Sequence, residues 1–134
     1  MNINLAVLTF ATLVAYITAR CPKPEELPKL TNGQQLCARL YDNTHSDVEL
    51  ACQGSYKEVI GGTSMPEIGE WKNRVSAVVV SKGCAIKLYS SRNYGGNSRT
   101  LMTGRHHDLR QYRRSFWVWK NWSDVTASYR CHCP

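Results

Sequence analysis

The sequence lacks a hydrophobic run long enough to cross a membrane as a helix. Its longest apolar stretch, residues 5–17, is interrupted by Thr9, Thr12 and Tyr16, whereas a transmembrane helix needs roughly 20 apolar residues. The stretch lies near the N-terminus and is followed by the small residue Ala19. This pattern predicts a signal peptide over residues 1–19 and a mature chain that enters the secretory pathway. The alternative is a buried N-terminal helix, favoured only by the absence of Lys and Arg before the run.

Recognisable catalytic motifs are also missing. The chain contains no Gly-x-Ser-x-Gly, no His-Glu-x-x-His and no glycine-rich phosphate loop. His106, His107 and Asp108 could supply a base and the group that orients it, but adjacent residues rarely converge on one point. We therefore expect a protein that acts by binding, with no enzymatic activity and no cofactor.

Acidic residues are scarce in only one half of the chain. The net charge is +7, but residues 20–70 carry a net charge of −3 and residues 71–134 a net charge of +10. Such asymmetry is typical of contact with a polyanion or an anionic membrane. Because the secretory pathway makes nucleic acid an improbable partner, we expect lipid headgroups, sulfated glycans or microbial envelope polymers. The alternative is a basic surface that only aids solubility or packing.

Cysteine is plentiful after the predicted cleavage point. In an oxidising compartment, six cysteines predict three disulfides, with the pairing left open by the sequence. A metal site is the alternative, but the chain lacks the Cys-x-x-Cys spacing that suits zinc. The cysteines are Cys21, Cys37, Cys52, Cys84, Cys131 and Cys133.

The mature chain changes character along its length. Residues 20–36 contain three prolines and predict an extended N-terminal arm. From residue 37 to residue 134, short runs of Val, Ile, Leu and Tyr alternate with turn residues, which predicts strands in a single all-β domain. Residues 75–80 and 84–89 are the clearest strands, and the first of these is apolar enough to be buried on both sides.

A weak internal repeat underlies this domain. Residues 37–41 resemble residues 84–89, and residues 71–78 resemble residues 122–129. We therefore expect two repeats, about 37–82 and 83–134. Two such units can pack face to face as a β-sandwich, because each covers the apolar face of the other.

These segments resemble known families. Residues 84–98 resemble the first hairpin of a βγ-crystallin Greek-key repeat, with an aromatic corner at Tyr94, a glycine at the sharp fold within Gly95-Gly96 and a downstream serine at Ser98. Over residues 37–133 the chain resembles the syncollin family in segments 36–42, 70–80, 111–114 and 122–133. The resemblance implies a βγ-crystallin-like β-sandwich of two Greek-key repeats, stabilised by disulfides.

The resemblance also implies a function. It points to a secretory (zymogen) granule protein on the lumenal face of the granule membrane, released extracellularly and acting in regulated exocytosis and granule fusion. Granule-membrane lipids or proteins would be its partners, and self-association and membrane perforation are implied as well. The alternatives are a cationic host-defence protein that binds microbial envelope polymers and a passive packing protein of granule contents.

Many βγ-crystallin repeats bind calcium through a loop of the form Asn/Asp-Asn/Asp-x-x-Ser/Thr-Ser, because a hard cation needs several oxygen ligands. Residues 72–77 place a positive side chain where an oxygen ligand belongs. Residues 123–128 keep one carboxylate but have Ala127 at a hydroxyl position. We expect no metal site, with Asp124 and Ser128 as weak calcium candidates against a purely structural turn.

The basic residues of the second half concentrate between residues 105 and 120. Trp117 and Trp119 would share one face of an extended segment. Tryptophan beside Lys and Arg suits a membrane interface, where each cation contributes about 1 kcal/mol against anionic lipid. The alternative is that the tryptophans fill the core and the arginines face water. The predicted membrane or polyanion site comprises Arg105, His106, His107, Arg110, Arg113, Arg114, Trp117, Trp119 and Lys120.

Two further features accompany this segment. His106 and His107 would gain charge near pH 6.5 if unperturbed, so we expect binding to anionic membranes to strengthen at acidic pH. The alternative is two exposed histidines without a role. Asn121 begins a formal N-glycosylation sequon within a tryptophan-led turn.

Overall fold

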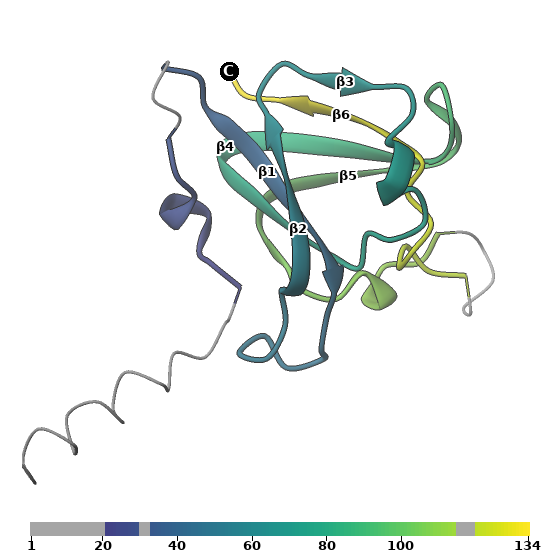
Figure 1. The fold of residues 1–134 in the computed structure, drawn as a ribbon, viewed down its shortest axis with the longest axis horizontal. Helices are drawn as coiled ribbons and strands as arrows, with labels where there is room; N and C mark the ends of the chain where they lie inside the picture. The colour runs from purple at the N-terminus through teal and green to yellow at the C-terminus, as the bar shows by residue number, and fades with distance from the viewer. Residues whose placement is uncertain (1–20, 30–32, 115–119) are drawn as a thin grey trace, which may run out of the picture.

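The structure, a computed structural model, describes residues 21–29, 33–114 and 120–134 (Figure 1). The predicted signal peptide lies outside this part. The described residues form strands joined by turns, and none of their helices is long and apolar enough to cross a membrane. The strands are β1 (Leu36–Asn43), β2 (Gln53–Ile60), β3 (Ser64–Met65), β4 (Ala77–Ser91), β5 (Gly95–His106) and β6 (Ser128–His132). The 3-10 turns are η2 (Pro24–Glu26), η3 (Gly69–Trp71) and η4 (Leu109–Gln111).

A long bent hairpin, β4–β5, connects two groups of strands. The first group contains β1 and β2, and the second contains β3 and β6. Residues 77–80 of β4 pair with β1, residues 85–89 of β4 pair with β6, and β5 pairs with both halves of β4. The sheet order is β2-β1-β4-β6-β3, so the sheet curls on itself. β3 comes from the first half of the chain but pairs with β6. The end of β5, residues 104–106, pairs with residues 78–80 of β4, which also pair with β1. These strands confirm the predicted all-β fold class, while the limits of the arm and repeats stay predictions.

The bend in β4 is fixed by side-chain hydrogen bonds and one glycine. The register shifts between Val80 and Ala85. The Thr103 hydroxyl contacts the Ser81 carbonyl at 2.9 Å and accepts from the Gly83 amide at 3.0 Å. Gly83 has φ +80°, a left-handed conformation that favours glycine. One strand can therefore belong to both groups without leaving its backbone groups unpaired.

The first half of β4 is buried on both faces. Val78 and Val80 lie in the main core with Leu40, Leu88 and other side chains from both strand groups. The alternate residues of β4 face a second cluster, formed with the N-terminal arm and the β1–β2 loop. This explains the near-continuous apolar run of that strand, because side chains alternate between the two faces.

All six cysteines form disulfides, as predicted. Cys21–Cys52 ties the arm to the start of β2, across 31 residues of sequence. Cys37–Cys131 and Cys84–Cys133 join β6 and the C-terminus to β1 and β4, across 94 and 49 residues. Each restricts the unfolded chain and contributes about 2–4 kcal/mol to stability.

The corner of the β4–β5 hairpin depends on a serine from the end of the chain. The Ser128 hydroxyl donates to the Ser91 carbonyl at 2.6 Å and accepts from the Tyr94 amide at 3.1 Å. The Tyr89 and Tyr94 rings meet edge to face, with centroids 5.5 Å apart. In the β1–β2 hairpin the corresponding ladder position is Ala77, opposite Tyr41, so that corner lacks the serine.

Replacing Ser128 by alanine should lower the free energy of unfolding by about 1–3 kcal/mol, because two backbone groups lose their partner. Urea unfolding would measure the change. Exposed Ser98 on β5 is the matched control, and Ser98→Ala should have little effect. Equal small losses in both variants would contradict a structural role for the Ser128 hydroxyl.

Candidate functional site

The basic segment after β5 is held to the protein by two buried side chains. Leu109, in η4, and Trp122 are buried in the main core. Backbone hydrogen bonds run from Tyr112 N to Leu109 O at 3.2 Å and from Trp122 N to Tyr112 O at 3.0 Å. The start and end of the segment therefore have a fixed place on the core.

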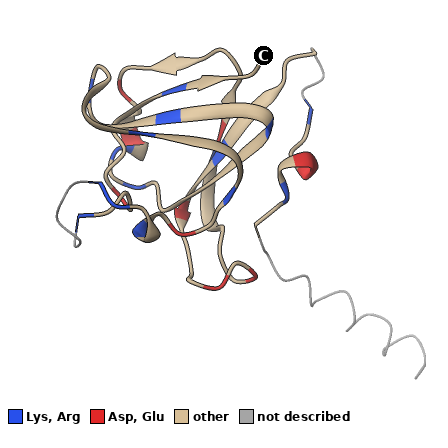
Figure 2. Cartoon of the chain, turned by 180° about the vertical axis from the view of Figure 1, so that it is seen from behind, with Lys and Arg blue, Asp and Glu red and all other residues tan. Residues whose placement is uncertain are grey.

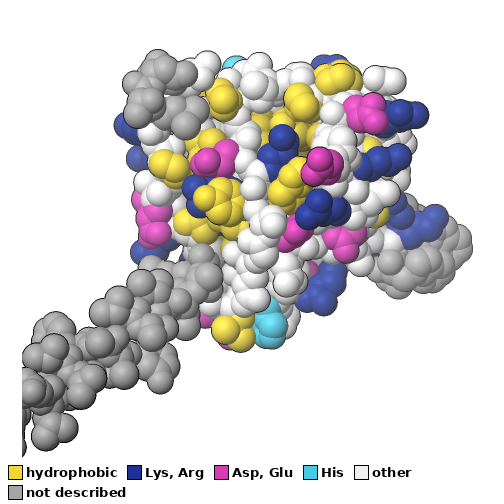
Figure 3. All heavy atoms as spheres, viewed as in Figure 1, with side chains coloured by type: hydrophobic (Ala, Val, Ile, Leu, Met, Phe, Trp, Pro, Cys, Tyr) yellow, Lys and Arg dark blue, Asp and Glu magenta, His cyan; other side chains and the backbone are white. Residues whose placement is uncertain are grey.

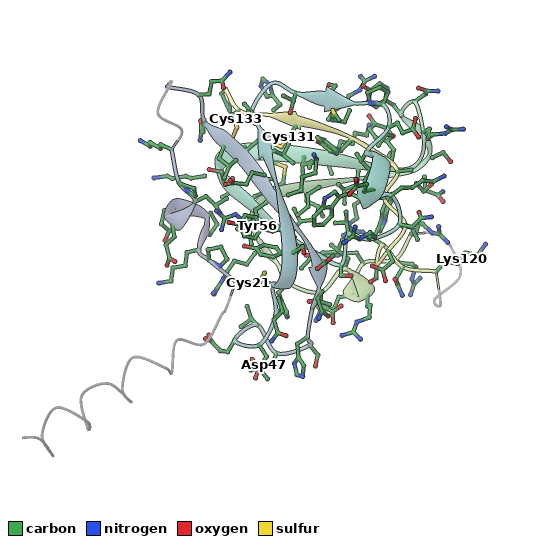
Figure 4. The ribbon with its side chains drawn as sticks, in the orientation of Figure 1. Cys21, Asp47, Tyr56, Lys120, Cys131 and Cys133 are labelled. Atoms are coloured by element: carbon green, nitrogen blue, oxygen red, sulfur yellow. A yellow bond between two sulfur atoms is a disulfide. The ribbon has the colours of Figure 1, made fainter. Side chains whose placement is uncertain are left out.

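The ends of this segment bring three predicted cations together. Arg113 and Asn121 form an antiparallel bridge, and the Arg114 amide donates to the Lys120 carbonyl at 2.8 Å. Arg113 and Lys120 are exposed and Arg114 is half-buried. Figure 4 places Lys120 at the right edge of the molecule. We call Arg113, Arg114 and Lys120 the paired cations. Residues 115–119, including Trp117 and Trp119, lie outside the described residues, so their role stays a prediction.

The remaining two predicted arginines differ in their charge balance. Burial would raise the pKa of Asp108, but hydrogen bonds from the side chain and amide of Arg110 outweigh it and lower the pKa. Arg110 contacts both Asp108 oxygens, at 2.8 and 2.9 Å, so this pair is internally neutral. Arg105, on β5, and the paired cations have no ion-pair partner in the described part of the chain. Their charge is thus available to an external anion.

The two adjacent histidines have different partners. His106 Nε2 lies 2.7 Å from the Met102 carbonyl, which only accepts, so this nitrogen carries the proton and donates. Its Nδ1 lies 2.7 Å from the Tyr112 hydroxyl, which donates to the neutral ring. His107 Nε2 donates to the Ser46 carbonyl at 3.1 Å, in the β1–β2 loop. His106 and His107, which the sequence analysis considered together, therefore have different surroundings in the structure.

A cation and an aromatic ring surround His106. Burial lowers the pKa of His106, as does the nearby Arg99 charge, whereas the hydrogen bond to Met102 raises it by a smaller amount. The Arg99 guanidinium lies over the Tyr112 ring, 4.3 Å from its centroid. Sequence reasoning missed Arg99 and Tyr112, because no spacing rule predicts that an arginine in β5 will stack on a tyrosine after η4.

The two loops considered for calcium lie side by side. The Asn73 amide donates to Thr126 O at 3.1 Å, and the Asp124 amide donates to Val75 O at 2.9 Å. An Asp124 carboxylate oxygen accepts from the Ser76 hydroxyl at 2.7 Å. Asp124 and Ser128 thus have separate partners, since the Ser128 hydroxyl is bonded at the hairpin corner. The expectation of no metal site, with these two residues as weak calcium candidates, stays a prediction.

Asn121 sits at the end of the basic segment. Its side-chain oxygen accepts from the Ser123 amide at 2.9 Å, and the residue is half-buried. This hydrogen bond fixes the turn that leads into Trp122. Glycosylation at this position stays a prediction.

Sequence relatives of the chain come from one family. The Syncollin family model matches residues 20–133. Syncollin from Rattus norvegicus is 32% identical over 130 residues, covering 95% of each chain. Syncollin from Homo sapiens is 28% identical over 114 residues, covering 84% of this chain and 83% of that protein.

Solved structures with the same fold are βγ-crystallin domains. A structure described under the evolution of the eye-lens βγ-crystallin domain fold has a TM-score of 0.56 at 16% identity, covering 88% of this chain and 94% of that one. An archaeal βγ-crystallin has a TM-score of 0.53 at 17% identity, covering 71% and 95%. A βγ-crystallin from Ciona intestinalis gives 0.51 at 17%, covering 69% and 95%. At these identities the likeness shows the fold alone.

The lowered pKa of His106 predicts a pH-dependent stability. The folded protein resists the proton that the unfolded chain accepts near pH 6.5. The contribution of neutral His106 to the free energy of unfolding is therefore present above pH 6.5 and is lost as the pH falls towards the folded-state pKa. Urea unfolding from about pH 7.5 to about pH 5 should show a smaller loss of stability for His106→Gln than for the unmodified chain.

Tyr112→Phe is the companion variant, because it removes the hydroxyl that donates to His106 but leaves the histidine. It should lower the free energy of unfolding by about 1 kcal/mol at neutral pH. Because His106 is still present, the variant should also lose stability as the pH falls, as the unmodified chain does. Identical pH profiles for His106→Gln and the unmodified chain would contradict this assignment.

Proposed function

Because the chain belongs to the syncollin family, we propose that it is a secretory (zymogen) granule protein that binds the anionic lumenal face of the granule membrane and acts in regulated exocytosis. The observation that carries the proposal concerns Arg113, Arg114 and Lys120, the paired cations. None of them forms a salt bridge with an acidic group in the described residues. The proposal includes release with the granule contents, self-association on the membrane and membrane perforation, which family membership suggests. The protein would act without catalysis.

The distribution of charge supports a membrane-facing end. Figure 2 shows basic residues at both ends of the segment that follows η4, with acidic residues in the β1–β2 loop and both acidic and basic residues in the arm. In the space-filling view, Lys and Arg side chains line the right edge of the molecule, and others lie at its centre and left edge among Asp and Glu (Figure 3). Anionic lipids attract such cations by about 1 kcal/mol per residue, and the attraction extends over roughly 8 Å at physiological salt.

The surrounding structure supports contact without unfolding. Leu109 and Trp122 hold the segment from the core side, and the Arg114–Lys120 hydrogen bond holds its ends together. Cations presented on a fixed base lose little conformational freedom on binding. The three disulfides suit an oxidising compartment such as the secretory pathway.

Charge reversal at the paired cations should weaken membrane binding. We expect Arg113→Glu combined with Lys120→Glu to reduce binding to phosphatidylserine-containing liposomes by at least about tenfold, because two attractions become repulsions. Co-sedimentation at physiological salt would measure it, and higher salt should reduce binding by the unmodified chain.

Lys29→Glu combined with Lys82→Glu is the matched control, since both lysines are exposed and the change in net charge is identical. These residues line a cavity together with residues of the N-terminal arm. Equal losses in both double variants would show a non-specific charge effect. Preference for lipopolysaccharide or peptidoglycan over granule lipids would instead favour the host-defence function, and no lipid preference would favour passive packing.

Membrane binding should also strengthen as the pH falls. Anionic lipid stabilises added positive charge on the protein, so lowering the pH from about 7.5 to about 5 should increase co-sedimentation. The increase at His106 should come below pH 6.5, because its pKa is lowered. A His106→Gln, His107→Gln variant should lose most of the increase, and a flat profile for the unmodified chain would refute the pH dependence.

A further inference from the structure

Two of the disulfides lie against each other at the end of the core. The Sγ atoms of Cys37, Cys84 and Cys133 all lie within 4.8 Å of one another. Cys84 and Cys133 are bonded to each other, whereas Cys37 is bonded to Cys131. The Cys37 sulfur is therefore close to both sulfurs of a second disulfide. The Cys131 sulfur is not a member of this close group.

This arrangement favours one direction of thiol–disulfide exchange. A thiolate attacks one sulfur of a disulfide and displaces the other, so the sulfur within reach is the one attacked. A thiolate at Cys84 would find Cys37 beside it, and Cys131 would be the leaving group. The four cysteines also differ in access, since Cys133 is half-buried and the other three are buried. An external thiol thus reaches Cys133 first.

We propose that these cysteines form an exchangeable pair of disulfides that responds to thiol reductants of the glutathione class. The reductant thiolate attacks Cys133 Sγ, forms a mixed disulfide there and releases the Cys84 thiolate. Cys84 then attacks Cys37 Sγ, which forms a Cys37–Cys84 disulfide and releases the Cys131 thiolate. Two sulfur–sulfur bonds break, two form, and the proton of the reductant thiol ends on Cys131.

The exchange changes what holds the last strand. In the oxidised protein, Cys37–Cys131 and Cys84–Cys133 tie β6 and the C-terminus to β1 and β4. After exchange, the new disulfide joins β1 to β4, and β6 keeps its ladders with β3 and β4 but has no disulfide to either β1 or β4. The device therefore converts contact with a reductant into release of the C-terminal strand from its covalent ties.

A Cys133→Ser variant tests the central step without any reductant, because it leaves Cys84 as a thiol beside Cys37. The variant is moved from about pH 4, where thiolate is scarce, to about pH 8. It is then quenched with acid at intervals, unfolded and alkylated, and its peptides are mapped by mass spectrometry. We expect the alkylated cysteine to shift from Cys84 to Cys131, with a Cys37–Cys84 link appearing. A thiol that stays on Cys84 while Cys37–Cys131 persists would overturn the proposal.

Cys52→Ser is the matched control, because it leaves a free thiol at Cys21 in the other hydrophobic cluster. In this variant the Cys37–Cys131 and Cys84–Cys133 disulfides should both persist. If Cys133→Ser does not fold, the unmodified chain is treated with reduced glutathione and mapped in the same way. Glutathione on Cys133 together with a Cys37–Cys84 link supports the exchange, whereas glutathione on Cys133 with Cys37–Cys131 intact refutes it.

Discussion

The structure depends on the burial of one strand by two layers at once. The first half of β4 has apolar side chains on both faces, so it needs the second strand group on one side and the arm with the β1–β2 loop on the other. The bend at Gly83 lets the same strand continue into the second group, where it pairs with β6. Because β4 and β5 pass through both groups, neither group can form its full set of backbone hydrogen bonds alone. The disulfides between β6, β1 and β4 reinforce the same junction.

The basic segment is a surface consequence of that core. Leu109 and Trp122 are core residues, and the chain between them must leave the core and return to it. The returning chain aligns Arg113 and Arg114 with Asn121 and Lys120. Asp108 is bonded to Arg110, and the paired cations have no ion-pair partner among the residues that the structure describes. The return of the chain to the core therefore both buries Trp122 and places the paired cations at the surface.

Family and fold were both predictable, for different reasons. The family was predicted from local segments such as 36–42 and 122–133, and the match over residues 20–133 confirms it. The fold class followed from short apolar runs between turn residues. This pattern can be recognised without knowing which strands pair. Ser128 shows the limit of such reasoning: its place in the sequence suggested an oxygen ligand, but its hydroxyl closes the β4–β5 corner. Position in a motif gives the residue type, whereas the partner depends on the neighbouring strand.

The sequence by itself determined the strand content, the oxidised cysteines and the excess of positive charge in the second half, because these depend on composition and local pattern. Only the tertiary structure decided which cysteines pair, which arginine is neutralised and which way each histidine faces. Cys37 and Cys131 are 94 residues apart in sequence, and Arg99 meets Tyr112 only because β5 and η4 pack on the same core. Contacts between distant segments are selected by the packing of the whole chain, so no local pattern could specify them.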